Sequence, residues 1–208
     1  MRVVIFDMDG TIIDSATAIE KTINGIRARL NLEPLSTDFI VKAINEPGRN
    51  LALEFYGMSS PSGSLKAGFE ADFKINYDLY ATTYNGIKEL LEKIRANGDK
   101  IALASNAPAK TLEQILKRNE IFELFDLVVG VDENIPQKPD PTMLLVVKEK
   151  LGVNRAVFVG DSLKDEGAAI NAKMPYIHVN WGFGTSADKN SFVANKPSEI
   201  YDILVSHI

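Results

Sequence analysis

The sequence predicts an α/β fold: a doubly wound, five-stranded parallel sheet with a small helical cap domain inserted into it. Two observations predict the sheet, because short apolar runs recur along the chain and segments with helical spacing separate most of them. A third predicts the insertion, since the stretch between the first two runs is far longer than one crossover helix.

The five apolar runs have the length and the continuous hydrophobicity of strands that are buried on both faces. They are Val3 to Phe6, Ile101 to Ala104, Leu127 to Val129, Ala156 to Val159 and Tyr176 to Val179. Helix-end signals lie between the runs: Gly98 suits the end of one helix, and Asp140 followed by Pro141 suits the start of another. Strands that alternate with helices indicate a parallel arrangement.

The long insertion is expected to form a helical cap at residues 15–81, which leaves residues 1–14 and 82–208 for the core domain. Apolar residues at helical spacing support this cap in two stretches. The first stripe is Ile19, Ile23, Ile26 and Leu30, and the second is Phe69, Phe73 and Tyr77.

The composition excludes several classes of protein. The chain has 208 residues, of which 45% are hydrophobic and 25% charged, as in ordinary globular proteins. A net charge of -5 with both signs mixed argues against nucleic acid as a partner. The chain has no cysteine, no signal-peptide pattern and no apolar run near the ~20 residues of a membrane span. We expect a cytoplasmic monomer or homodimer with no membrane partner.

Asp7 and Asp9 directly follow the first predicted strand, at the sheet edge where open α/β sheets bind ligands. One carboxylate can attack phosphorus to give an aspartyl-phosphate that water cleaves, and the second can move the proton. An isolated Asp-x-Asp-Gly string fits equally well with two turn carboxylates that cap the next segment.

Ser105 and Asn106 follow the second predicted strand, and Lys138 stands between Gln137 and two nearby prolines. A hydroxyl and free N–H groups at a helix start suit a phosphoryl oxygen, and a lysine can neutralise it. Each residue also has an ordinary interpretation, as a helix cap or as a surface cation.

Asp161 and Asp165 follow the fourth predicted strand, and carboxylate oxygens are the ligands that Mg²⁺ takes. Capping of the following helix is the alternative, and both roles are compatible. Four such positions after successive strands make a set for phosphoryl transfer that is more specific than any one of them.

These motifs, in this order over nearly the whole chain, resemble the haloacid dehalogenase-like hydrolase superfamily in its phosphoglycolate phosphatase-like branch. The resemblance implies that Asp7 is the nucleophile, and that Asp9 is the general acid and base and also gives its backbone carbonyl to Mg²⁺. It implies that Ser105 and Lys138 bind the phosphate. It further implies metal roles for Asp161, as a ligand, and for Asp165, through water or by orienting the site.

Within the resemblance, Asp9 indicates phosphoryl chemistry, because halide departure in a dehalogenase needs no proton. The Thr11–Ser15 and Trp181–Thr185 stretches favour a hydrolase over a sugar phosphomutase. We also expect Met8, Thr11 and Asn106 to contact phosphate or substrate.

Arg49 lies in the Glu46–Asn50 stretch, where a cap of this kind presents a loop to the active site. Its guanidinium could clamp a carboxylate or second phosphate, or it could be a solvated arginine at a helix start. The predicted function is Mg²⁺-dependent hydrolysis of a small phosphomonoester, phosphoglycolate-like or pyrophosphate. The alternatives are a β-phosphoglucomutase-like phosphomutase and a non-catalytic phosphate-binding or regulatory protein.

Overall fold

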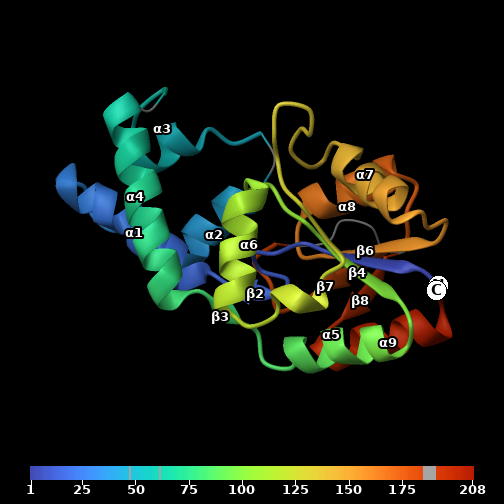
Figure 1. Ribbon diagram of the computed structural model, residues 1–208. Helices are drawn as coiled ribbons and strands as arrows, with labels where there is room; N and C mark the ends of the chain where they lie inside the picture. Colours follow the sequence, from blue (N-terminus) through green and yellow to red (C-terminus); the bar gives the residue numbers. More distant parts are fainter. Residues whose placement is uncertain (47, 61, 185–190) are drawn as a thin grey trace.

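The structure, a computed structural model, describes residues 1–46, 48–60, 62–184 and 191–208 (Figure 1). Within these residues, six strands form one parallel sheet in the order β5-β4-β1-β6-β7-β8. The strands are β1 (Val3–Phe6), β4 (Lys100–Ala104), β5 (Leu127–Val129), β6 (Ala156–Gly160), β7 (Tyr176–Val179) and β8 (Phe192–Ala194). The predicted parallel sheet is confirmed, and all five apolar runs are strands.

The predicted number of strands is wrong by one, because β8 adds a sixth strand beside β7. This strand has only three residues, and its middle residue, Val193, is 44% exposed. An edge strand of this length buries too few side chains to leave a continuous apolar run in the sequence.

Helices cover both faces of the sheet, as a doubly wound fold requires (Figure 1). Alternate residues of β1 face opposite sides of the sheet. Val4 and Phe6 pack in an apolar cluster with three helices on one face, and Val3 and Ile5 pack in a second cluster with two helices on the other face. The first three are α5 (Ile87–Ala96), α6 (Ala109–Arg118) and α9 (Pro197–Ser206), and the other two are α7 (Thr142–Leu151) and α8 (Leu163–Asn171). A short 3-10 helix, η1 (Phe122–Leu124), precedes β5.

Four of the helices between β1 and β4 lie to one side of the sheet (Figure 1). We call them the inserted bundle: α1 (Ala16–Arg29), α2 (Thr37–Asn45), α3 (Leu51–Tyr56) and α4 (Gly63–Tyr80). The two connections to the sheet pair as an antiparallel ribbon of β2 (Ile13–Asp14) and β3 (Thr82–Thr83). The predicted domain boundaries at residues 14/15 and 81/82 fall at the end of this ribbon, and we retain that division as a proposal.

Four residues of the two predicted apolar stripes lie in the apolar cluster of the inserted bundle. Ile19 and Ile23 of α1 are buried in the bundle cluster, against which Phe69 and Phe73 of α4 pack. Tyr77, the last residue of the second stripe, instead belongs to the apolar cluster on the sheet. The end of α4 is therefore part of the core that supports the strands.

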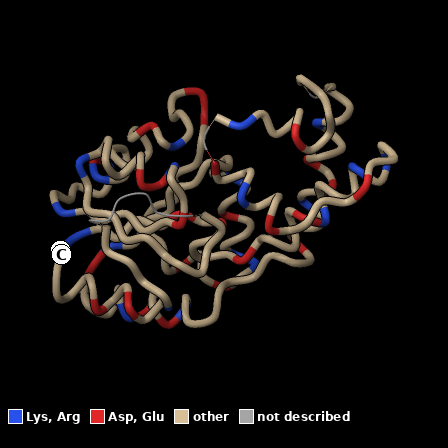
Figure 2. The backbone as a smooth tube through the Cα atoms, turned by 180° about the vertical axis from the view of Figure 1, so that it is seen from behind, with Lys and Arg blue, Asp and Glu red and all other residues tan. Residues whose placement is uncertain are grey.

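Both signs of charge are spread along the chain (Figure 2), in keeping with the small net charge of -5. Among the described helices, none combines the length and the apolar character needed to cross a membrane.

The register of the central strands places the predicted site residues at one edge. Phe6 of β1 is level with Leu103 of β4 and Val159 of β6. Because these strands are parallel, Asp7, Ser105 and Asp161 all emerge at their carboxyl ends.

Candidate active site

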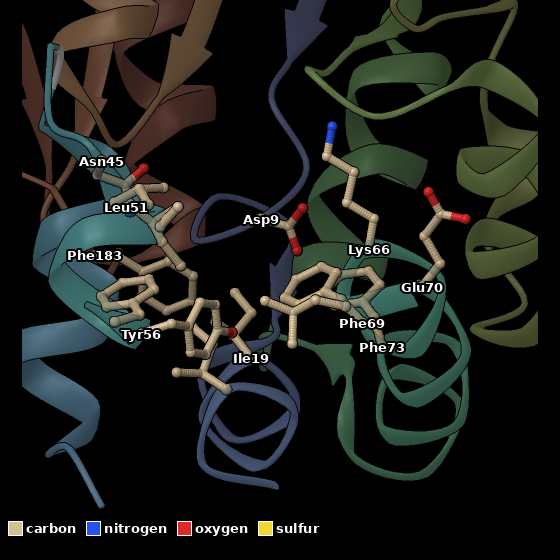
Figure 3. Close-up of a pocket in the computed structure, with 15 residues that line it drawn as sticks. Asp9, Ile19, Asn45, Leu51, Tyr56, Lys66, Phe69, Glu70, Phe73 and Phe183 are labelled. Carbon is tan, nitrogen blue, oxygen red and sulfur yellow. The ribbon is translucent and has the colours of Figure 1, made fainter. Parts of the chain in front are cut away.

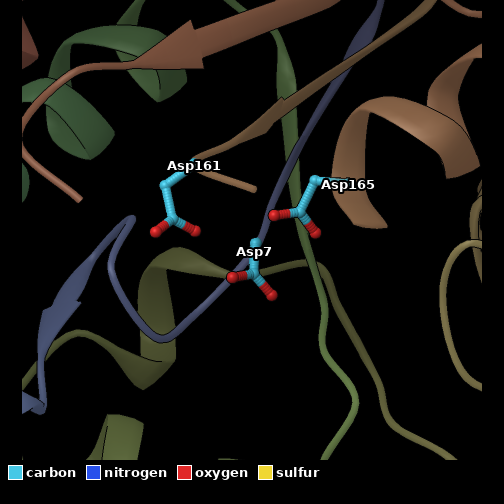
Figure 4. Close-up of side chains that lie close together, drawn as sticks. All are labelled: Asp7, Asp161 and Asp165. Carbon is cyan, nitrogen blue, oxygen red and sulfur yellow. The ribbon is translucent and has the colours of Figure 1, made fainter. Parts of the chain in front are cut away.

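Three carboxylates meet at the carboxyl edge of the sheet (Figure 4). Asp7 follows β1, Asp161 follows β6, and Asp165 lies in the first turn of α8. All three are buried, and each offers a carboxylate oxygen within 4.8 Å of the others. We call these residues the acidic cluster. The structure thus brings together two of the motifs that the sequence places more than 150 residues apart.

Lys138 enters the acidic cluster and supplies a positive charge to it. Its Nζ donates to Asp7 Oδ1 at 2.5 Å, to Asp165 Oδ1 at 2.6 Å and to the Ala104 carbonyl at 3.1 Å. Burial lowers the pKa of Lys138, but the charges of Asp165 and Asp7 outweigh burial and hold this pKa above its usual value. The ammonium therefore stays charged, with its three protons directed at three oxygen atoms.

Asn106 fixes the loop that carries Lys138. Its Oδ1 accepts from the Lys138 backbone N–H at 2.8 Å, and its Nδ2 donates to the Lys138 carbonyl at 3.4 Å. Ser105 is buried next to it, and its N–H donates to the Val129 carbonyl of β5. The Asn106 side chain thus positions the lysine, and the phosphate contacts predicted for Ser105 and Asn106 stay predictions.

Asp165 serves the site and caps a helix at the same time. Its Oδ2 accepts from the backbone N–H of Ser162 at 3.1 Å and from the hydroxyl of Ser162 at 2.6 Å, which completes a capping box at the start of α8. Its Oδ1 accepts from Lys138. Both interpretations of Asp165 from the sequence are therefore compatible with its contacts.

Asp161 has one satisfied oxygen and one that lacks a partner. Its Oδ2 accepts from the N–H groups of Phe183 at 2.6 Å and Gly184 at 3.2 Å. Its Oδ1 is buried and has no hydrogen-bond partner among the described residues. Burial, with the nearby charge of Asp165, raises the pKa of Asp161 to about 7. Such a buried acceptor is a natural ligand for a cation, whose charge would lower that pKa.

Two glycines make room for Asp161. Gly10 has a φ of +80°, and a Cβ there would lie 2.3 Å from Asp161 Oδ2. A Cβ at Gly182 would lie 2.3 Å from Asp161 Cβ and 2.5 Å from the Gly10 carbonyl oxygen. The Trp181–Gly184 segment therefore forms one wall of the site, while Thr185 of the predicted stretch lies outside the described residues.

Trp181 ties this wall to the first motif. Its Nε1 donates to the Thr11 carbonyl at 3.1 Å. Met8 is buried in the core, and its carbonyl accepts from the N–H groups of Ile12 and Ile13 in a tight loop. The loop between Asp7 and Ile13 is thus held by its own backbone and by Trp181, and the substrate contacts expected of Met8 and Thr11 stay predictions.

Asp9 contacts a residue of the inserted bundle. The hydroxyl of Tyr77, at the end of α4, donates to Asp9 Oδ1. Burial raises the pKa of Asp9, and the hydrogen bond from Tyr77 works against that rise. Arg118 of α6 holds this end of α4 by donating to the carbonyls of Tyr77 and Ala81. The four-residue spacing of Phe73 and Tyr77 in the sequence indicates only that both rings pack on one helix face. The sequence therefore gives no sign that the Tyr77 hydroxyl contacts Asp9.

Asp9 also lines a cavity of about 480 Å³ between the inserted bundle and the loop after β7 (Figure 3). Arg49 is not one of its lining residues. Its guanidinium pairs with Glu46 at 2.7 Å and with Glu54, and it lies 5.5 Å from the Phe39 ring centre. The structure therefore does not bring Arg49 to the acidic cluster, and the predicted clamp stays a prediction.

The chain is similar to known proteins over almost its whole length. The family model described as haloacid dehalogenase-like hydrolase matches residues 4–179. A phosphoglycolate phosphatase from Aquifex aeolicus is 31% identical over 211 residues, which cover 100% of this chain and 99% of the relative. A phosphoglycolate phosphatase from Psychrobacter arcticus is 30% identical over 97% of this chain and 91% of its own length. The solved structure of a predicted phosphoglycolate phosphatase from Haemophilus somnus has a TM-score of 0.83 at 23% identity, covers 97% of each chain and so shares the fold.

The glycine contacts with Asp161 predict the effect of adding one methyl group. Gly182→Ala should displace Asp161 and lower the affinity of the acidic cluster for a divalent cation, with Mg²⁺ as the probe, by about tenfold or more, as disturbed supporting contacts at metal sites do. Calorimetric titration with Mg²⁺ measures this affinity. Gly25→Ala is the matched control, because no atom lies within 4 Å of a Cβ added there. Equal affinities in the two variants would contradict the role given to Gly182.

Proposed function

The chain belongs to the haloacid dehalogenase-like hydrolase family as a phosphatase, and we propose that it hydrolyses a phosphate monoester with Mg²⁺ and a covalent intermediate on Asp7. One observation carries this proposal: Lys138 joins Asp7 to Asp165 inside the acidic cluster. Asp9, two residues after Asp7, opens onto a cavity in which a leaving group fits.

The acidic cluster fits a divalent cation. Among the described residues, Lys138 is the cation that forms ion pairs with its carboxylates, and Asp161 Oδ1 lacks a partner. Mg²⁺ prefers carboxylate and carbonyl oxygens and keeps several waters. Asp7, Asp161 and the Asp9 carbonyl would hold the ion, with Asp165 behind them. When bound, Mg²⁺ would neutralise charge on the phosphate and the attacking carboxylate.

Asp7 is proposed as the nucleophile. One of its oxygens would form a bond to phosphorus while the ester P–O bond breaks, and water would later release inorganic phosphate from the aspartyl-phosphate. Burial raises the pKa of Asp7, and Lys138 opposes that rise. The lysine thus favours the ionised, nucleophilic form and stays close to the charge that develops on the phosphoryl oxygens.

Asp9 is proposed to move the proton. It would protonate the leaving oxygen in the first step and take a proton from water in the second. The pKa of Asp9 is raised by burial, which suits a carboxyl group that must hold a proton in one step and lose it in the next. Tyr77 fixes one carboxylate oxygen and so orients the other toward the leaving group.

The comparisons do not favour the two alternatives. The curated relatives named above are phosphatases. A phosphomutase must also let a bisphosphate turn around beside the nucleophile, and the cavity next to Asp9 has mostly apolar walls. A non-catalytic phosphate-binding protein would not need the nucleophile, the lysine and the metal carboxylates together.

Removal of the nucleophile gives the first test. Asp7→Asn should lower kcat for phosphate release by about 10⁴-fold or more, because the amide cannot form the covalent intermediate. Asp14→Asn is the control, since Asp14 is an exposed carboxylate near the start of α1. Persistent turnover in Asp7→Asn, after deamidation is excluded by mass spectrometry, would falsify the assignment.

The contact of Tyr77 with Asp9 gives a second test. Tyr77→Phe keeps the buried ring but removes the donor, so kcat/KM should fall by about tenfold through loss of orientation while the melting temperature changes little. Tyr80→Phe, at an exposed position on the same helix, is the control. If both variants have the wild-type kcat/KM, then Tyr77 does not position Asp9.

Metal removal gives a third test. Chelation should abolish phosphate release, and Mg²⁺ should restore it and raise the melting temperature, because the ion binds the folded chain. Asp161→Asn should remove most of this Mg²⁺-dependent stabilisation. Full activity in excess chelator would refute the metal requirement.

A further inference from the structure

The cavity beside Asp9 is where the group that leaves the phosphate must lie. Its walls come from all four helices of the inserted bundle and from Phe183, whose N–H donates to Asp161. A volume of about 480 Å³ lies in the range of small-molecule sites. The following inference rests on the proposed function, because Asp9 is taken to protonate the leaving oxygen.

The charged groups on the cavity wall are few and lie at its margin. Apart from Asp9, the ionisable carboxylate and ammonium groups among the described lining residues are Glu70 and Lys66. Both are exposed and lie four residues apart on α4. Arg49, the cation expected to bind an acidic leaving group, pairs with Glu46 and Glu54 instead. A second carboxylate or phosphate on the substrate would lose its water against apolar walls without a buried cation to replace it, which is costly.

The walls present aromatic rings on two sides of Asp9. Phe69 and Phe73 of α4 stack with ring centres 5.7 Å apart, and Tyr77 continues the row at 5.1 Å from Phe73. Figure 3 shows Phe183 on the opposite side of the cavity from Phe69 and Phe73, with Asp9 between them. Aromatic side chains on both sides of the cavity favour an apolar, ring-bearing leaving group between them.

Tyr56 supplies a polar group in this apolar space. Its hydroxyl is buried and has no hydrogen-bond partner in the part of the chain that the structure describes. Burial raises the pKa of Tyr56 to about 12, so the hydroxyl is neutral at physiological pH. Figure 3 shows the side chain of Tyr56 among the lining residues on the side of Phe183. A buried hydroxyl of this kind is satisfied when a bound molecule offers it a polar atom.

We infer that the substrate is the phosphate monoester of an uncharged aromatic alcohol, with its ring between Phe183 and the Phe69–Phe73 pair. A polar atom on the ring would bond to the Tyr56 hydroxyl. Hydrolysis would break the P–O ester bond, with Asp9 giving the proton to the alcohol oxygen, and water would supply the oxygen of the released phosphate. Small esters whose leaving group carries a carboxylate, such as phosphoglycolate, would be the poorer substrates.

A series of esters tests this inference on the wild-type chain with Mg²⁺. Phosphate release is measured from ethyl phosphate, 2-phenylethyl phosphate, 3-phenylpropyl phosphate and phosphoglycolate. The three esters with uncharged leaving groups have alkyl leaving oxygens of similar reactivity, so differences in kcat/KM among them report contacts of the ring. We expect 3-phenylpropyl phosphate to exceed ethyl phosphate and phosphoglycolate by about tenfold or more.

The outcomes separate the two proposals. Phosphoglycolate hydrolysed as well as or better than the aromatic esters would overturn the inference and leave the phosphatase assignment intact. Absence of phosphate release from every ester would count against the proposed function, and the inference would fall with it.

Variants locate the effect in the cavity. Phe69→Ala should lower the ratio of kcat/KM for 3-phenylpropyl phosphate to that for ethyl phosphate by about tenfold. Leu79→Ala, on an exposed face of the same helix, should leave this ratio unchanged. Phe69→Leu keeps an apolar side chain at this position if the alanine variant folds poorly, and should lower the ratio to a smaller extent. An unchanged ratio in the Phe69 variants would overturn the inference.

Tyr56→Phe tests the polar end of the cavity. The variant should lose activity on 3-(4-hydroxyphenyl)propyl phosphate relative to 3-phenylpropyl phosphate, because only the former offers a partner to the hydroxyl. Equal effects on the two esters would contradict the contact that we assign to Tyr56.

Discussion

The ion pairs of Lys138 are the interaction on which the rest of the site depends. Three carboxylates lie together where water is largely excluded, and without a cation their repulsion and desolvation would drive them to protonate. Lys138 joins Asp7 to Asp165, and Asn106 fixes its backbone in place. One ammonium balances part of this charge, which leaves a site whose remaining negative charge suits a divalent ion.

The two halves of the chain divide the chemistry between them. In the proposed reaction, the sheet edge supplies the groups that act on the phosphate, while the inserted bundle supplies most of the walls around the leaving group. Tyr77 connects the two, since it packs with the core, donates to Asp9 and lies in the last turn of the helix that carries Phe69 and Phe73. A change of substrate thus needs new residues only on the bundle and on the loop at Phe183.

The sequence predicts the parts of the structure that short patterns encode. The run before Asp7 has the continuous hydrophobicity of a buried parallel strand, and the resemblance extends to Lys138, which lies in the acidic cluster. Contacts between distant segments leave no such pattern. Gly182 leaves room for the Asp161 side chain, a contact that only the folded structure shows. The hydroxyl of Tyr77 belongs to a residue that the sequence pattern places in an apolar stripe. The short edge strand β8 lacks a continuous apolar run.

The central claim is that the buried carboxylate held by Lys138 becomes covalently phosphorylated. Acid quenching of the Mg²⁺-loaded chain during turnover, followed by peptide mass spectrometry, tests it most directly. The account predicts a phosphoryl group on the peptide that contains Asp7, at a level that rises and decays at rates consistent with kcat. Phosphoryl transfer to another residue, or steady phosphate release with the Asp7 peptide unmodified at every time point, would contradict the account.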